Sequence, residues 1–374
     1  MVMFKSSSGR LISIDFLRVL FCTGVVIGHA YCIFFRNQYV ELYQKEFTDI
    51  HIMCVDAFFM ISGIMMAMYF EKHKKEELHE VFLQYHLHRY VRFLFPLLFM
   101  YMIGIVMFAC MGHFFSITSI LKNSSVLLML SHTNSFGNSF EVPSWYIDSL
   151  FWMGVFVSFF LCFFKKKSLI FVFPICIYLC LSYIHAKFRN LNLGGNPYIQ
   201  GFFSAGNLRA LVGLSFGIEL FHISNRLKNK NVNLNLKMPL IILIECLCIL
   251  GLIFTFTRPP LKETEFLIYP CIGLLLFLFL QKKECLFSVV NLKPVAKFIS
   301  LLSSISFMVY LSHVPLFFLI RHFFQKMIQQ QNVITNNIHT YIILICIAYL
   351  YGMGLYSLEK ILECSLKRYC KITV

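Results

Sequence analysis

The sequence predicts an all-α polytopic membrane protein of about ten transmembrane helices, with both the N- and C-termini in the cytosol. Of its 374 residues, 58% are hydrophobic and only 14% are charged, and the mean hydropathy is +0.72. Soluble domains hold about 45–50% apolar and about 25% charged residues, so this composition excludes an ordinary water-soluble globule. The 43 Phe and 18 Tyr residues also exclude a disordered chain, because disordered chains contain few aromatic residues.

Ten apolar segments are long enough to cross a bilayer. Because hydrocarbon offers the backbone no hydrogen-bond partner, each is expected to be an α-helix. The predicted spans are 11–35, 50–70, 93–115, 143–164, 168–186, 203–222, 238–257, 266–281, 298–320 and 339–358. The segment 117–133 has only a short apolar core, so we interpret it as a re-entrant or interfacial piece of a long outer loop at 113–142. No repeat or linker divides the chain, and 1–374 is expected to form a single transmembrane domain.

The distribution of Lys and Arg predicts the orientation. With the N-terminus in the cytosol, most of the 33 Lys and Arg residues fall in the inner connections, as the positive-inside rule requires. Membrane topology and attraction to anionic lipid therefore explain the net charge of +15, without nucleic acid as a partner. The stretch 71–92 holds several of these cations and is interpreted as a basic amphipathic segment on the cytosolic side.

The first span carries two ionisable groups on one face. Arg18 and His29 are eleven positions apart, so they point within roughly 20° of one another and lie about 16 Å apart along the helix axis. Ionisable groups at bilayer depth are costly and usually mark function. An unperturbed imidazole has a pKa of about 6.5, so His29 can serve as a general base near neutral pH. The alternative is that Arg18 reaches back to the inner interface and that His29 only packs in the bundle.

Other spans carry ionisable residues at comparable depths. In the outer half these are Asp56, Asp148, Arg209 and His313, and in the inner half they are Asp15, Arg18 and Glu219. Two interpretations remain open, a polar cavity through the bundle or ion pairs that hold helices together. Arg89 and Arg92 lie on adjacent turns before the third span and can clamp a phosphate. A positive-inside flank is the alternative for this pair.

Two further motifs are not interpreted as catalytic. GLSFG at 213–217 matches the nucleophile-elbow pattern, but that pattern needs a strand–turn–helix context and here lies in a predicted span. Gly213 and Gly217 instead predict a small-residue packing face between helices. His79 and Glu80 lack the second histidine of a zinc HExxH site, so no metal is expected.

Five blocks, in order along the chain, resemble the membrane acyltransferase-3 family, whose members are polytopic O-acyltransferases of glycans. The blocks are IDFLR at 14–18 with VIGH at 26–29, DAFFMISG at 56–63, RYVR at 89–92 with FP at 95–96, SWY at 144–146, and YLSHVP at 310–315. They resemble, in turn, the family's first-helix signature with R-x10-H spacing, its FFxxSG block, its cytosolic RxxR block, the opening of a later helix, and its YLxH block. Many members carry a Glu shortly after the tryptophan block, where this chain has Asp148.

The resemblance implies transfer of an acyl group, most often acetyl from acetyl-CoA, to a hydroxyl of an extracytoplasmic glycan or glycolipid. The residues that it implicates are His29, Arg18 and Asp56 in catalysis, Arg89, Arg92 and Arg18 in binding of the acyl donor, and Trp145, Asp148 and His313 in substrate binding. His29 is expected to remove the proton of the acceptor hydroxyl or to carry the acyl group transiently. Acetyl-CoA is then a co-substrate, and the resemblance implies a bacterial inner membrane as the location.

A transporter or flippase of a glycan precursor is the main alternative function. Ten helices and polar intramembrane residues fit this class equally well. The sequence shows no repeated halves and no pair of interrupted helices in matching positions, which many transporters have. A purely structural scaffold would need none of the Arg18, His29, Arg89 and Arg92 side chains.

Overall fold

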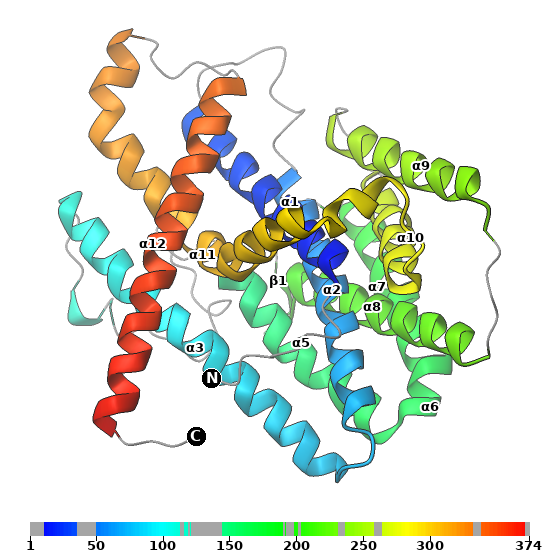
Figure 1. Cartoon of the computed structure of the whole chain (residues 1–374). Helices are drawn as coiled ribbons and strands as arrows, with labels where there is room; N and C mark the ends of the chain where they lie inside the picture. The colour runs from blue at the N-terminus through cyan, green and yellow to red at the C-terminus, as the bar shows by residue number, and fades with distance from the viewer. Residues whose placement is uncertain are drawn as a thin grey trace.

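The computed structural model describes residues 11–35, 50–112, 116–118, 120, 144–189, 191, 198–200, 203–230, 236–257, 264–331 and 338–370. Over these residues the chain is almost entirely helical (Figure 1). The long helices are α1 (Ile12–Ala30), α2 (Ile50–Lys72), α3 (Leu78–Cys110), α5 (Ser144–Phe163), α7 (Phe173–Phe188), α8 (Ala205–Asn229), α9 (Met238–Thr257), α10 (Ile268–Gln281), α11 (Lys293–Gln331) and α12 (Ile338–Cys370).

Short elements connect or extend these helices. They are a π-helical turn at Tyr31–Phe35, α6 (Lys165–Lys167), a π-helical turn at Ser168–Val172, 3-10 turns at Thr264–Leu267 and Leu286–Asn291, and the strands β1 (Tyr198–Gln200) and β2 (Phe203–Ser204). The two strands pair antiparallel and lead directly into α8. The hydroxyl of Ser204 then caps α8 by accepting a hydrogen bond from the backbone N–H of Asn207 at 3.3 Å.

Nine helical segments among the described residues are long and apolar enough to cross a membrane. The predicted span 203–222 corresponds to α8, which is not one of the nine. It is less apolar than the others because it carries Asn207, Arg209 and Glu219 within its first fifteen residues. The chain is therefore a polytopic all-α membrane protein, close to the predicted fold of about ten helices.

The directions of the packed helices fit α8 as the sixth of ten crossings. When a chain crosses the membrane back and forth, the helices of its odd-numbered crossings are parallel to one another, and so are those of its even-numbered crossings. Helix α8 runs parallel to α2. Asp56 contacts Arg209, and Met60, which lies further along α2, contacts Gly217, which lies further along α8. It also runs parallel to α10, with which it shares contacts at Phe216–Tyr269 and at Ser224–Gln281. Which ends of the helices face the cytosol stays a prediction.

Helix α3 is longer than the predicted third span. It begins at Leu78 and continues to Cys110, so most of the stretch 71–92 and most of the span 93–115 form one helix. Its first half packs against α5 through His86, whose Nε2 lies 2.6 Å from Ser158 Oγ. The predicted outer loop 113–142 lies outside the described residues, apart from 116–118 and 120.

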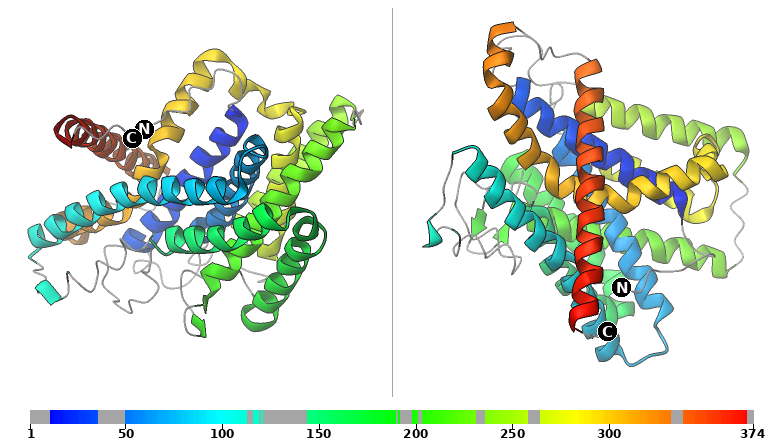
Figure 2. Two further views of the ribbon diagram at one scale, coloured as in Figure 1. Left: turned by 90° about the horizontal axis from the view of Figure 1, so that it is seen from below. Right: turned by 60° about the vertical axis from the view of Figure 1, so that its left-hand side comes forward.

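Helices α2 and α8 cross at very close range near the middle of the bundle. A Cβ at Gly213 would overlap the Phe59 side chain, and one at Gly217 would overlap the backbone carbonyl of Met60. The prediction that Gly213 and Gly217 form a small-residue packing face is therefore confirmed. Helix α12, in contrast, lies at the margin of the bundle (Figure 2), and only 22% of its membrane window is buried, against 67% for α2. The polar sites described below lie among the inner helices.

Candidate active site

His29 and His313 form a pair of imidazoles between α1 and α11. His29 Nδ1 lies 3.1 Å from His313 Nε2, and the two ring centroids are 5.0 Å apart. His313 is completely buried, whereas His29 is half-buried. Each ring also meets a carbonyl oxygen of its own helix, His29 Nδ1 at Val25 (3.1 Å) and His313 Nδ1 at Val309 (3.0 Å). The sequence placed both histidines in the membrane, but it did not predict that they touch.

The backbone next to His29 departs from regular α-helix. The π-helical turn Tyr31–Phe35 follows α1 directly, and such turns occur frequently at functional sites. Arg321 on α11 donates from Nη1 to the carbonyl oxygen of Ile33 at 2.9 Å. This bond fixes the end of α1 against α11 beyond the histidine pair.

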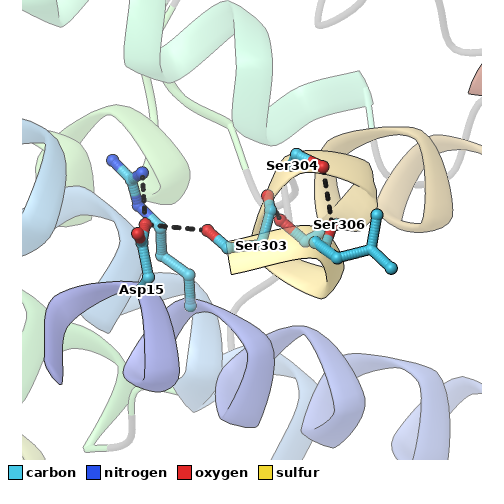
Figure 3. A network of polar contacts seen from close by, with 6 residues as sticks. Asp15, Ser303, Ser304 and Ser306 are labelled. Carbon is cyan, nitrogen blue, oxygen red and sulfur yellow. Dashed lines mark hydrogen bonds and ion pairs between the residues drawn. The ribbon is translucent and has the colours of Figure 1, made fainter. Parts of the chain in front are cut away.

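Asp15 and Arg18 occupy the opposite end of the same α1 face. Ser303 Oγ on α11 donates to Asp15 Oδ1 at 2.8 Å (Figure 3). Arg18 Nη1 lies 3.5 Å from the same oxygen. Midway between the two ends, Cys22 Sγ donates to the Ser306 carbonyl at 3.4 Å. Asp15, Cys22 and His29 are spaced by seven residues, which keeps them on one face of the helix. The Arg18 side chain is 32% exposed, so this cation is accessible in a way that Asp15 is not.

Three guanidinium groups gather at this end of the bundle. Arg92 experiences the charges of both Arg18 and Arg89, so a cationic cluster links α1 to α3. Arg89 Nη1 donates to the Tyr85 hydroxyl at 3.1 Å, and its Cζ lies 5.5 Å from the centre of the Phe93 ring. Like charges held close together favour a bound anion, and paired guanidinium groups suit phosphate geometry.

Asp56 lies in a closed ion pair. Arg209 donates from Nε to Asp56 Oδ1 (3.1 Å) and from Nη2 to Oδ2 (2.7 Å), and both side chains are fully buried. The Tyr269 hydroxyl donates to Oδ1 as well, at 2.8 Å. A carboxylate held by three donors at this depth has the geometry of a helix-to-helix connection. The predicted catalytic role of Asp56 has no support from this arrangement and stays a prediction.

The start of α5 lies between the ion pair and the histidine pair. The Trp145 ring stacks on Arg209, whose Cζ is 5.6 Å from the ring centre. The next residue, Tyr146, packs against Tyr310 with ring centroids 5.4 Å apart, and Tyr310 lies 6.2 Å from the His313 ring. Asp148 is buried one turn further along α5.

The structure therefore distributes the predicted residues over three places. His29 and His313 touch each other; Arg18, Arg89 and Arg92 share the cationic cluster; Asp56 and Trp145 both contact Arg209. Sequence reasoning missed Ser303, Tyr269 and Tyr310 as partners. Tyr310 lies within the YLSHVP block, which is a usable signal, whereas Ser303 and Tyr269 carry none that the sequence reveals.

One exposed group could ligate a metal ion. Among the residues that the structure describes, Glu77, His79 and Glu80 place ligand atoms within 4.8 Å of one another on the surface at the start of α3. Exposed acidic groups of this kind are common without an ion, and no metal centre is assigned to them. The expectation of no metal stays a prediction.

Comparison with known sequences gives one match. The profile of the acyltransferase-3 family, described as an acyltransferase domain, matches residues 11–356. This range contains every residue of the three polar groups described above. No curated protein and no solved structure matches the chain significantly.

Proposed function

The chain belongs to the acyltransferase-3 family and is a multi-pass membrane acyltransferase, and we propose that it moves an acetyl group from acetyl-CoA to a hydroxyl of an extracytoplasmic glycan or glycolipid. The observation that carries this proposal is the polar face of α1, which has Arg18 at one end and the imidazole of His29 at the other. An anion-binding end and a basic end on one helix suit a reaction between a phosphorylated donor and an alcohol. We place the protein in a bacterial inner membrane, with both termini in the cytosol.

The cationic cluster of Arg18, Arg89 and Arg92 is the proposed site for the phosphates of the acyl donor. Coenzyme A is made in the cytosol, and the positive-inside rule predicts that this end of the bundle faces the cytosol. Guanidinium groups form paired, charge-assisted hydrogen bonds with phosphate oxygens. Further cations are expected on the same side of the membrane, among them Lys74 and Lys165, which both bond to Glu71.

His29 is the proposed general base. Its imidazole takes the proton of the acceptor hydroxyl while the hydroxyl oxygen attacks the thioester carbonyl carbon. The carbon–sulfur bond then breaks, and the proton passes to the departing CoA thiolate, so that the ester and free CoA thiol are the products. In the second form of the proposal, His29 first accepts the acyl group itself and then passes it to the alcohol. The acceptor side would involve Trp145, Asp148 and His313.

Turnover by purified protein in lipid nanodiscs tests the role of His29. Acetyl-CoA and a glycan acceptor are supplied, and the released CoA thiol is measured. His29→Ala is expected to lower turnover by about 10²–10⁴-fold while the protein stays folded. His322→Ala on the exposed part of α11 is the matched control and is expected to behave as wild type. Wild-type turnover by His29→Ala would discard the role, and no thiol release by the wild type with any acceptor would favour the transporter alternative.

Donor affinity tests the cationic cluster. A hydrogen bond to a charged group contributes about 1.5–3 kcal/mol, so Arg89→Ala and Arg92→Ala are each expected to raise the KM for acetyl-CoA by about tenfold or more. Arg226→Ala, an exposed arginine near the end of α8, is the control for general surface charge. An equal effect of all three variants would show that Arg89 and Arg92 act only through the surface potential. Mass spectrometry of surface glycans with and without the protein then identifies the acyl group and its acceptor.

A further inference from the structure

His29 and His313 contact each other and the backbone carbonyls of their own helices. Three contacts bear on where the protons lie: His29 Nδ1 with the Val25 carbonyl, His313 Nδ1 with the Val309 carbonyl, and His29 Nδ1 with His313 Nε2. A carbonyl oxygen only accepts hydrogen bonds, so each Nδ1 must carry a proton to satisfy its own carbonyl. In the neutral pair each ring holds a single proton. His313 Nε2 is then bare and accepts from His29 Nδ1–H, which it shares with the Val25 carbonyl in a three-centre hydrogen bond, and this assignment is compatible with all three contacts.

The opposite assignment fails at two places. If His313 Nε2 carried the proton and donated to His29 Nδ1, both Nδ1 atoms would be bare. Two nitrogen lone pairs would then face the carbonyl oxygens of Val25 and Val309 at 3.1 and 3.0 Å, with no proton between nitrogen and oxygen in either contact. Two acceptor atoms held at hydrogen-bond distance without a proton between them repel each other, so both contacts would be unfavourable. The hydrogen-bonding pattern therefore favours one tautomer strongly.

We propose that His313 is a positioning residue that holds His29 in the Nδ1–H tautomer, so that the basic lone pair of His29 lies on Nε2. This inference rests on the proposed function, in which His29 is the base. When His29 Nε2 takes the proton of the acceptor hydroxyl, the ring becomes an imidazolium with protons on both nitrogens. Its Nδ1–H bond to the bare Nε2 of His313 then becomes charge-assisted and stronger. His313 thus stabilises the protonated base without itself touching the reacting atoms.

The burial of the two rings fits this division of roles. His313 is completely buried and contacts α1 at His29, whereas His29 is half-buried. Tyr310, one turn before His313, packs against it with ring centroids 6.2 Å apart, and Phe317, one turn after it, does so at 6.0 Å. The His313 ring is therefore held in one orientation between two aromatic rings. The proposed base is the more exposed ring of the pair, and the ring that orients it is the fully buried one.

Two amide substitutions separate hydrogen bonding from packing. The side-chain amide of Gln reaches the position of a histidine Nε2, so His313→Gln keeps an acceptor for His29 Nδ1–H. The shorter Asn reaches only the position of Nδ1, so His313→Asn loses that acceptor while it keeps a polar side chain. We expect His313→Gln to retain most of the turnover, and His313→Asn and His313→Leu to lose about 100-fold in kcat. The KM for acetyl-CoA is expected to stay unchanged in all three, because the donor phosphates bind elsewhere.

Nitrogen NMR gives a readout that does not depend on turnover. Protein labelled with ¹⁵N-histidine in lipid reports which ring nitrogen carries a proton, and the His29→Ala spectrum identifies the His29 signals. The wild type and His313→Gln are expected to show protonated Nδ1 and bare Nε2 at His29, and His313→Leu a mixture of both tautomers. A His29 tautomer and a kcat that are unchanged in both Asn and Leu variants would overturn the inference. If His29→Ala itself keeps wild-type turnover, the proposed function fails instead, and the NMR result still decides whether His313 sets the tautomer.

Discussion

The bundle contains two buried polar pairs that differ in kind. Asp56 and Arg209 join α2 to α8 through two charge-assisted hydrogen bonds, and Tyr269 adds a third donor to the same carboxylate. His29 and His313 join α1 to α11 through a single contact between two groups that are neutral in the pattern assigned above. In the first pair, two opposite charges neutralise each other. In the second pair, a basic nitrogen can take up a proton.

This difference distinguishes a buried polar pair that stabilises the fold from one that can take part in a reaction. A charge in a low-dielectric interior is tolerated when a partner of opposite sign neutralises it. Removal of one partner then lowers the free energy of unfolding. A neutral imidazole costs less to bury, and it can still change its charge during a reaction. Substitutions in the first pair should therefore act on folding, and substitutions in the second should act on turnover.

The largest stability effect is expected from Asp56→Ala. This change leaves the guanidinium of Arg209 fully buried without its carboxylate, which typically costs about 3–5 kcal/mol. The yield of folded protein in membranes and its thermal unfolding in detergent measure the loss. His29→Ala is the companion variant, and its unfolding temperature should stay close to that of the wild type.

A triple substitution can show whether Asp56 has a role beyond folding. Asp56→Leu with Arg209→Met and Tyr269→Phe removes both charges and the remaining hydroxyl, so no polar group of this set is left without its partner. Apolar replacement of a whole buried pair is often neutral or stabilising. Recovery of both stability and turnover would contradict the catalytic role predicted for Asp56. Recovery of stability alone would support that role.

A smaller loss is expected where α2 and α8 cross. The backbone carbonyl of Met60 occupies the space that a Cβ at Gly217 would need, so Gly217→Ala must push the two helices apart. Overpacking of this kind costs about 1–3 kcal/mol, and it should also disturb the Asp56–Arg209 geometry about two turns away along α8. Gly354→Ala on α12 is the control, because nothing lies within 4 Å of the added Cβ. That variant should be neutral or gain up to about 1 kcal/mol, and equal losses in both variants would contradict the packing argument.

The helices could be predicted from the sequence because long apolar runs in a bilayer have only one way to satisfy their backbone. The start of α3 at Leu78 was missed because its first half is polar and lies beyond the apolar run from which the span was predicted. Helix α8 corresponds to a predicted span, although it is less apolar than the nine helical segments that are long and apolar enough to cross a membrane.

The candidate site was predictable within a helix but not between helices. The helical period alone places Arg18 and His29 on one face, and the structure turns that face toward α11 through Ser303 and His313. That His313 meets His29 across 284 residues of sequence depends on how α1 and α11 pack, which no local pattern encodes. The predicted depth of a residue in the membrane was a partial guide to its partner. Asp56 and Arg209 were both expected in the outer half, and they do form a pair.

The smallest effect is expected at the cationic end of α1. Ser303→Ala removes the hydroxyl that donates to Asp15, at a cost of about 0.5–1.5 kcal/mol in stability. The Asp15 carboxylate keeps its contact with Arg18, and a tighter pair between them draws the guanidinium away from the proposed phosphate site. We therefore expect a modest rise in the KM for acetyl-CoA with kcat unchanged. Ser304→Ala is the matched control, because the Ser304 hydroxyl donates to the Leu301 carbonyl of its own helix (Figure 3). A fall in kcat at constant KM in Ser303→Ala would place Asp15 and Arg18 with the chemical step of the histidine pair and not with donor binding.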